Sequence, residues 1–402
     1  MKNFNFKSVV PHLIAVVVFL VVAVIYCKPV LEGKVVQQHD ITNWKGSIQQ
    51  SVEYKNTHGR YPLWTNSLFS GMPTFQIGFE GNNIVPGIAH TILTLGLPIP
   101  IQFFFLACIC FYFLCIVLRV NPYVGIIGAL SFAYATYDPV IIAVGHNTKM
   151  WSIAYMPALL GSIILIYERK YWIGVALTAV IASVMVAMNH PQVDYYFFLV
   201  AAIMTIAYII RWIRTKEYKH MFISLGLTLI AATVGLLTNA VNLLSTYEYQ
   251  KETIRGGTSV LVANSSEIHS KTGLDKDYAF AYSAFKTEPL VMMFPRIYGG
   301  SSQMEISQDQ SKAFEALQTL GQENINAVQE HTGVSLLNLL GSYWGGISNN
   351  GAVGTSGPPY VGAIICFLFI LGMVVIDKKY RGWILSAVVL TILMSWGSYF
   401  DA

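Results

Sequence analysis

Residues 99–118 read IPIQFFFLACICFYFLCIVL, a run of 20 positions without a charged side chain. An α-helix of this length is about 30 Å long, which matches the thickness of the hydrocarbon core of a bilayer. The run therefore predicts a transmembrane helix. Residues 13–27, LIAVVVFLVVAVIYC, predict another near the start of the chain.

Apolar runs of this kind recur along the chain. The composition agrees, because 54% of the residues are hydrophobic and 11% are charged, a balance that a water-soluble core does not require. The predicted spans are 8–27, 99–118, 121–138, 150–168, 171–189, 193–211, 221–238, 359–376 and 382–399. We therefore predict an all-α polytopic membrane protein, a bundle of about nine transmembrane helices.

The first run has basic residues before it, as a signal peptide does. No cleavage site of small residues follows, since the run passes directly into Lys28 and Pro29. We expect an uncleaved first transmembrane helix.

Basic residues are distributed unequally between alternate short loops. Positive residues are retained in the cytoplasm, so their excess marks the inner side. With the N-terminus inside, the inner loops hold Arg119, Arg169, Lys170, Arg211, Arg214, Lys216, Lys219, Lys378, Lys379 and Arg381. The alternate short loops hold only Lys149. We expect a cytoplasmic N-terminus, with both long hydrophilic segments outside.

This topology predicts an organisation in five parts. They are a first transmembrane helix (1–27), a first extracytoplasmic loop with an interfacial helix at 84–97 (28–98), transmembrane helices 2–7 (99–238), a large extracytoplasmic loop domain (239–358) and helices 8–9 (359–402). The cytoplasmic side has only short turns, so any chemistry is expected outside.

Asp40 lies early in the first outer loop, beside His39. A carboxylate close to the membrane surface is suited to take a proton from a hydroxyl that meets a lipid-linked substrate. The alternative is a solvated loop acid. Further along, Trp64 lies in an aromatic, Pro- and Gly-containing segment that can form a substrate surface or an interfacial anchor.

Two short outer loops are rich in functional residue types. One contains His146 and Lys149, and the other contains His190, Gln192 and Asp194. Lys149 is a candidate phosphate contact as a point charge. The histidines are candidates for hydrogen bonding, and no close ligand spacing favours the alternative of a metal site. In the large loop, Arg296 is a candidate phosphate or sugar contact, and a solvated surface is its alternative.

The span interiors contain almost no ionisable residue, which argues against an ion-coupled carrier. The net charge of +4 is small and scattered, which argues against a nucleic-acid partner. The five cysteines lie in or beside apolar runs, which argues against a disulfide framework.

Several short motifs occur in a fixed order. They are His39-Asp40, Arg60-Tyr61-Pro62-Leu63-Trp64, Gly71-Met72-Pro73, Gly145-His146-Asn147-Thr148-Lys149, Asn189-His190-Pro191-Gln192 and Gly357-Pro358-Pro359-Tyr360-Val361-Gly362. Together they resemble the bacterial YfhO membrane-protein family, over nearly the whole chain. That family resembles the GT-C glycosyltransferases, whose fold carries an essential acid in the first outer loop. Its members are commonly longer, so the end at Ala402 is expected to mark a fragment or a shortened form.

The resemblance implies an enzyme of the bacterial inner membrane in which Asp40 is the catalytic acid residue. It would move a sugar from a polyprenyl-phosphate donor to an envelope polymer, glycolipid or protein, without a cofactor. The alternative hypothesis is a non-catalytic membrane protein that binds, moves or scaffolds lipid-linked glycans. Convergence of Asp40, Lys149 and His190 on one cavity would favour the enzyme.

Overall fold

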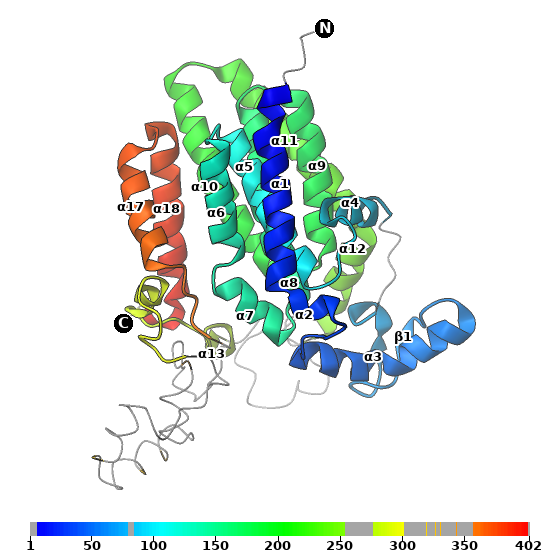
Figure 1. The fold of residues 1–402 in the computed structure, drawn as a ribbon. Coiled ribbons are helices and arrows are strands. Elements are labelled where there is room, and N and C mark those ends of the chain that lie inside the picture. Colours follow the sequence, from blue (N-terminus) through cyan, green and yellow to red (C-terminus); the bar gives the residue numbers. More distant parts are fainter. Residues whose placement is uncertain are drawn as a thin grey trace. The chain divides into compact units, whose positions relative to one another are not determined.

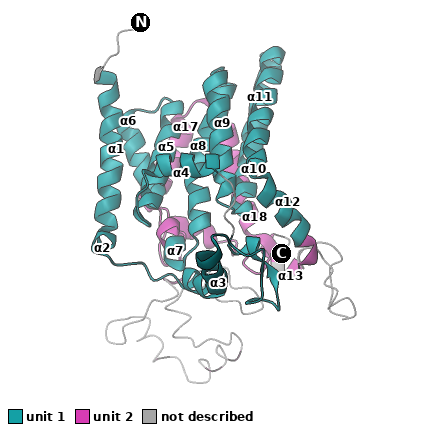
Figure 2. Cartoon of the chain, turned by 90° about the vertical axis from the view of Figure 1, so that its right-hand side faces the viewer, with its two compact units in different colours: residues 1–134, 141–249 teal, residues 135–140, 250–402 magenta. Residues whose placement is uncertain are grey.

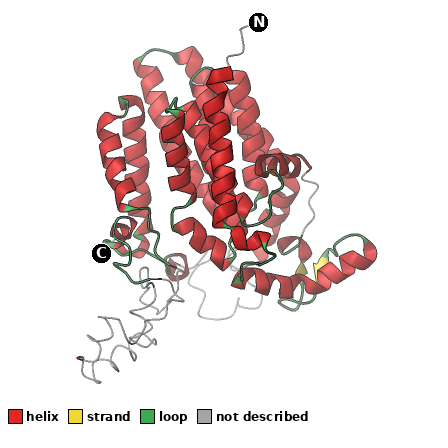
Figure 3. Cartoon of the chain, viewed as in Figure 1, coloured by secondary structure: helices red, strands yellow, loops and turns green. Residues whose placement is uncertain are grey.

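The computed structural model of the chain describes residues 6–78, 84–253, 276–300, 319, 326, 330, 343 and 357–400. Within these residues the chain is mostly helical, and its sheet is a two-stranded antiparallel hairpin (Figure 3). This agrees with the predicted all-α class.

The chain divides into two compact units (Figure 2). Unit 1 comprises residues 1–134 and 141–249, and unit 2 comprises residues 135–140 and 250–402. Helix α7, Tyr137–Val144, contributes to both. The other elements of unit 1 are α1 Phe6–Tyr26, α2 Lys28–Leu31, α3 His39–His58, β1 Trp64–Thr65, β2 Met72–Pro73, η1 Thr74–Gln76, α4 Ile84–Thr94, α5 Ile101–Val117, α6 Pro122–Ala133, α8 Asn147–Tyr167, α9 Tyr171–Ala187, α10 Pro191–Arg214, α11 Tyr218–Leu237 and α12 Ala240–Tyr249. The other elements of unit 2 are η2 Gln250–Glu252, α13 Lys276–Ala279, η3 Glu288–Met292, α17 Ala363–Val375, α18 Lys378–Ser395 and η4 Gly397–Tyr399.

The core of unit 1 is built around α8, which is buried along most of its length. It packs against α5 and α9, and α9 packs in turn against α11. Small residues permit close helix contacts, because a Cβ at Gly235 of α11 would lie only 2.8 Å from the Cβ of Ala182 in α9. Lipid gives helices no hydrophobic reason to associate, so close packing of this kind holds the bundle together.

At one end of unit 1, α3 follows α2 and runs across the direction of α1 (Figure 1). We call this the α3 end of the unit. The side chain of Gln38, directly before α3, contacts Asn147, where α8 begins. His190, directly before α10, contacts Thr148 in the first turn of α8. Both α8 and α10 therefore begin at the α3 end.

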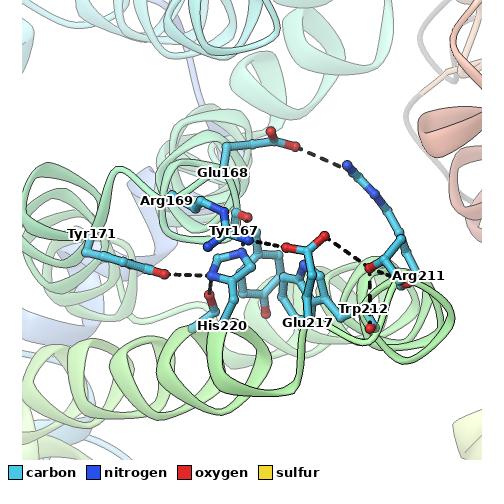
Figure 4. A network of polar contacts seen from close by, with 10 residues as sticks. Tyr167, Glu168, Arg169, Tyr171, Arg211, Trp212, Glu217 and His220 are labelled. Atoms are coloured by element: carbon cyan, nitrogen blue, oxygen red, sulfur yellow. Dashed lines mark hydrogen bonds and ion pairs between the residues drawn. The ribbon is translucent and has the colours of Figure 1, made fainter.

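Polar contacts tie the α8–α9 turn to the α10–α11 turn at the opposite end (Figure 4). Nδ1 of His220 lies 2.6 Å from the hydroxyl of Tyr171, and its Nε2 lies 2.9 Å from the carbonyl oxygen of Tyr167. Because a carbonyl can only accept, Nε2 carries the hydrogen and Nδ1 accepts from Tyr171. Arg169 pairs with Glu217 beside them. These contacts lock the two helix pairs to each other.

A helix lies in each of the nine predicted spans. Among the described residues, the helices long and apolar enough to cross a membrane are Lys7–Tyr26, Asn147–Tyr167, Pro191–Arg214 and Tyr218–Leu237. Helices α5, α9 and α17 are apolar but shorter. The helices are those of a membrane protein, while the count of nine spans stays a prediction.

The span predicted at 121–138 is present as two helices instead of one. The structure has α6 and α7, bent by 41° at a short break, and together they qualify as one broken span. Pro139 explains the break. Proline is tolerated in the first turn of a helix but not in the interior, so a new helix begins just before it, at Tyr137.

The predicted loop at 28–98 contains more helix than expected. Its residues His39–His58 form α3, a 20-residue helix that ends at Gly59 in the left-handed conformation. The helix expected at 84–97 is present as α4, and it packs on α9 and α5. His90 of α4 lies 2.8 Å from the hydroxyl of Tyr155 in α8.

The large loop domain expected at 239–358 falls largely outside the described residues. Of its described part, α12 belongs to unit 1. In unit 2, the backbone N–H of Ala284 donates to the carbonyl oxygen of Ser395 at 2.8 Å, and Val361 donates to Met292 at 3.2 Å. Residues 276–300 therefore pack against the end of α18 and the chain that leads into α17.

Candidate active site

The N-terminus of α3 lies against the loop between α7 and α8. The buried side chain of Gln38 donates to the carbonyl oxygen of Ile142 at 2.5 Å and to Oδ1 of Asn147 at 3.0 Å. Gly145 permits this contact, because its φ is +109° and a Cβ there would lie 3.2 Å from the backbone nitrogen of Ile41. A residue with a side chain is strained in this conformation. Glycine at this position therefore lets the loop approach α3.

The same contact brings Asp40 against His146. Oδ2 of Asp40 lies 2.8 Å from Nε2 of His146, and their side chains are 47% and 45% exposed. The imidazole orients the carboxylate, while the exposure leaves it open to a substrate. A carboxylate held in this way has the arrangement of a general base. His39 is exposed beside it in the first turn of α3.

His190 and Lys149 belong to the same neighbourhood. Nδ1 of His190 lies 3.4 Å from Oγ1 of Thr148. Burial is the largest cause that lowers the pKa of His190, and the charges of Lys149 and His146 lower it further. Such charge effects require short separations. We call Asp40, His146, Lys149 and His190 the Asp40 cluster.

Gln192 and Asp194 lie in the first turn of α10, immediately after His190. The side-chain amide of Gln192 donates to the hydroxyl of Tyr196 at 3.0 Å. Oδ1 of Asp194 is buried, and no described residue donates a hydrogen bond to it. Both residues therefore adjoin the Asp40 cluster.

Trp64 lies in the hairpin of β1 and β2, which packs on α3. Its indole N–H donates to Oδ1 of Asn66 at 3.1 Å, and the ring lies directly over Gly71. The hydroxyl of Ser67 donates to the carbonyl oxygen of Ser47 in α3 at 3.0 Å. Trp64 is 55% exposed, so its ring is available to a ligand or to lipid.

Arg296 belongs to unit 2. It is exposed and has a φ of +65° in the turn where Gly299 donates to its carbonyl oxygen at 3.1 Å. Its role as a phosphate contact stays a prediction.

A cavity of about 380 Å³ lies beside the hairpin in unit 1. It is lined by Arg60, Tyr61, Pro62, Leu63, Phe75, Gly78, Val241, Asn242 and Ser245. The members of the Asp40 cluster do not line it, so they do not converge on this cavity. The convergence on one cavity that was expected for an enzyme is therefore not seen at this cavity, which the sequence did not predict.

Sequence reasoning missed Gln38 and Asn242. Both are uncharged, and each acts through a contact distant in sequence, since the side-chain amide of Asn242 donates to Oδ1 of Asn189 at 3.3 Å. For Gln38, the only indication in the sequence was its position in the polar segment directly before His39 and Asp40. In the part of the chain that the structure describes, no three His, Cys, Asp or Glu side chains are close enough to hold a metal ion.

Comparisons with protein-family models, with curated proteins and with solved structures give no match to this chain. The resemblance of its motifs to the YfhO family stays a prediction. Function has to be inferred from the side chains at the α3 end of unit 1.

Proposed function

We propose that the chain is a membrane glycosyltransferase of the GT-C type, which moves a sugar from a polyprenyl-phosphate donor to a hydroxyl of an envelope acceptor. The observation that carries the proposal is the Asp40–His146 pair, a half-exposed carboxylate oriented by an imidazole at 2.8 Å. The pair lies in unit 1, where α1, α8, α10 and α11 are long and apolar enough to cross a bilayer. A lipid-linked donor would be held by such helices with its head group at their ends.

In the proposed reaction, Asp40 accepts the proton of the acceptor hydroxyl as that oxygen bonds to the anomeric carbon of the sugar. The bond from this carbon to the phosphate oxygen breaks, and the lipid phosphate leaves with the electron pair. Negative charge grows on the phosphate in the transition state, so a nearby cation accelerates the step. Lys149 would supply that cation, because its charge already acts on His190 beside the pair.

The proposal includes the topology. With the N-terminus in the cytoplasm of a bacterial cell and about nine spans in the inner membrane, the α3 end faces outward, where polyprenyl-phosphate sugars are used. The Lys and Arg distribution supports this orientation, since Arg169 and Arg214 lie at the opposite end of unit 1. The resemblance of the motifs to the YfhO family supports it as well.

A second candidate function is the binding or transport of lipid-linked glycans without catalysis. The cavity favours it, because its lining does not include Asp40 or Lys149. A binding protein needs the cavity but no particular carboxylate, so substitution of Asp40 separates the two functions.

The test is transfer from radiolabelled polyprenyl-phosphate sugars to envelope extracts by the purified protein and its Asp40→Asn variant. Asparagine keeps the size of the side chain but cannot take the proton, so turnover should fall by about a hundredfold or more. Donor binding and thermal unfolding should change little. The matched control is Glu53→Gln, which removes an exposed carboxylate from the same helix. Among the contacts that the structure gives the Glu53 side chain, its carboxylate accepts a hydrogen bond only from Gln49, one turn away.

Near-normal turnover of Asp40→Asn in an assay that detects transfer by the parent would refute the catalytic role. Loss of donor binding together with early unfolding would make the carboxylate structural. Absence of any labelled product from the parent, with donor still bound, would favour the glycan-binding function.

A further inference from the structure

We propose that the cavity lined by Arg60, Tyr61, Phe75, Asn242 and Ser245 is the acceptor site and that it takes a carbohydrate carrying an anionic group. This inference rests on the proposed function, because it names the acceptor of the same reaction. The volume of about 380 Å³ lies in the range of small-molecule sites and accommodates a ligand of modest size.

The lining combines two kinds of surface. Tyr61 and Phe75 offer aromatic faces to the apolar side of a sugar ring, while Asn242 and Ser245 offer hydrogen-bonding groups to its hydroxyls. The aromatic rings are held in place, since the ammonium of Lys55 lies 4.6 Å from the ring centroid of Tyr61. Phe75 is supported at its edge by Tyr249, with ring centroids 6.2 Å apart.

The charge of the lining selects the substituent. Among the described residues that line the cavity, Arg60 carries the only formal charge. Its guanidinium is exposed and presents a planar fork of donors, which matches the two oxygens of a carboxylate or a phosphate. A neutral sugar would leave this group without a counterpart, so an anionic sugar is the better ligand.

Two contacts connect the cavity to the Asp40 cluster. The indole N–H of Trp44 donates to the carbonyl oxygen of Ile77 at 2.7 Å, next to Gly78 of the lining. Trp44 is one helical turn, about 6 Å, from Asp40 along α3. The second contact is that of Asn242 with Asn189, the residue before His190. Helix α3 has Asp40 at one end and Arg60 just beyond the other, so an acceptor chain of several sugars held in the cavity would extend along α3 toward Asp40.

The test measures binding rather than transfer, with the full chain in lipid nanodiscs. The probes are a β-linked glucose disaccharide, the same disaccharide ending in glucuronate, and the same disaccharide carrying a phosphate. Both anionic probes should bind about tenfold more tightly than the neutral one, or more, and the comparison between them identifies the preferred anion. The substitution Arg60→Gln should reduce both anionic probes to the affinity of the neutral probe, while the control Lys28→Gln should change nothing.

Equal affinity of all three probes for the parent, or an anion preference that survives Arg60→Gln, would overturn the inference. Displacement of the probes by dodecanol, which carries neither a sugar nor an anion, would assign the cavity to a lipid chain instead and overturn the inference too. If Arg60→Gln unfolds early, Tyr61→Ala provides the second test, since it should weaken all three probes alike. Asp40→Asn should bind the probes normally. Transfer by a parent protein that does not bind the probes would refute only the acceptor site. Binding of the probes without any transfer would refute the enzyme and leave the cavity as a binding site for anionic carbohydrates.

Discussion

The substitution Gly145→Ala tests whether the loop between α7 and α8 holds Asp40 and His146 together. Alanine at a φ of +109° costs about 1–3 kcal/mol, and its Cβ would lie 3.2 Å from the backbone of Ile41. The loop can relieve both the backbone strain and the close contact with Ile41 by moving away from α3. That movement breaks two hydrogen bonds of Gln38, worth about 1 kcal/mol each, and an exposed pair worth at most about 1 kcal/mol.

Because the strain and the lost contacts are of similar size, the paired arrangement should fall to about half of the molecules or fewer. Hydrogen exchange of the Thr42 amide, which donates to the carbonyl oxygen of Gln38 at 3.0 Å, should then accelerate by about tenfold or more. Turnover should fall only a few-fold, because the remaining paired molecules still react. The control is Gly46→Ala in the middle of α3, where a Cβ meets open space and alanine favours the helix. Exchange and turnover of Gly145→Ala that match the control would refute the reasoning.

Three further predictions concern charge and topology. Lys149→Ala should weaken binding of a polyprenyl-phosphate donor by about tenfold, and Lys149→Arg by less because the charge is kept; unchanged affinity in both excludes Lys149 from the donor site. The pKa of His190 is lowered in the folded protein, so as the pH falls the imidazole is protonated in the unfolded chain before it is protonated in the folded one. Protonation therefore favours the unfolded chain, and stability is lost as the pH falls below about 6.5. His190→Gln should therefore lose less stability than the parent between pH 7 and pH 5 in thermal unfolding, and identical pH dependence would contradict this. The half-buried Cys366 is replaced by serine, and the other four cysteines are buried. In this background a cysteine introduced at Thr57 should react with an impermeant thiol reagent in intact cells and one introduced at Arg214 should not, and the reverse pattern would invert the topology.

The helices that cross the apolar layer could be read from the sequence because lipid demands a long run of apolar side chains. The span expected at 193–211 is present within α10, Pro191–Arg214. Helix α3 gave no such signal. Its apolar residues Ile41, Trp44, Ile48 and Val52 recur at helical spacing but are separated by polar residues, so the segment lacks the long apolar run that marks a span. Gly59 at its end is a recognisable stop.

The sequence predicted which residues of the candidate site share one side of the membrane, but it did not predict which of them contact each other. Alternating loops placed Asp40, His146 and His190 on one side, and the structure brings them together at the α3 end. The pairing of Asp40 with His146 depends on the backbone of Gly145, which spacing along the chain cannot reveal. The cavity escaped notice because Asn242 and the other residues of α12 that line it follow a long apolar run and carry no charge.

The locked turns at the end of unit 1 opposite α3 also give the bundle a pivot. Helix α8 is 21 residues long, so about 31 Å separate the tie at Tyr167 from the other end of the helix. A tilt of about 5° around that tie displaces the far end by about 2.7 Å, which is close to the length of a hydrogen bond. Lys149 lies at that far end of α8, and His190 lies at the corresponding end of α10. A rotation small enough to leave Arg169 and Glu217 in contact can thus change whether Lys149 and His190 reach the same ligand.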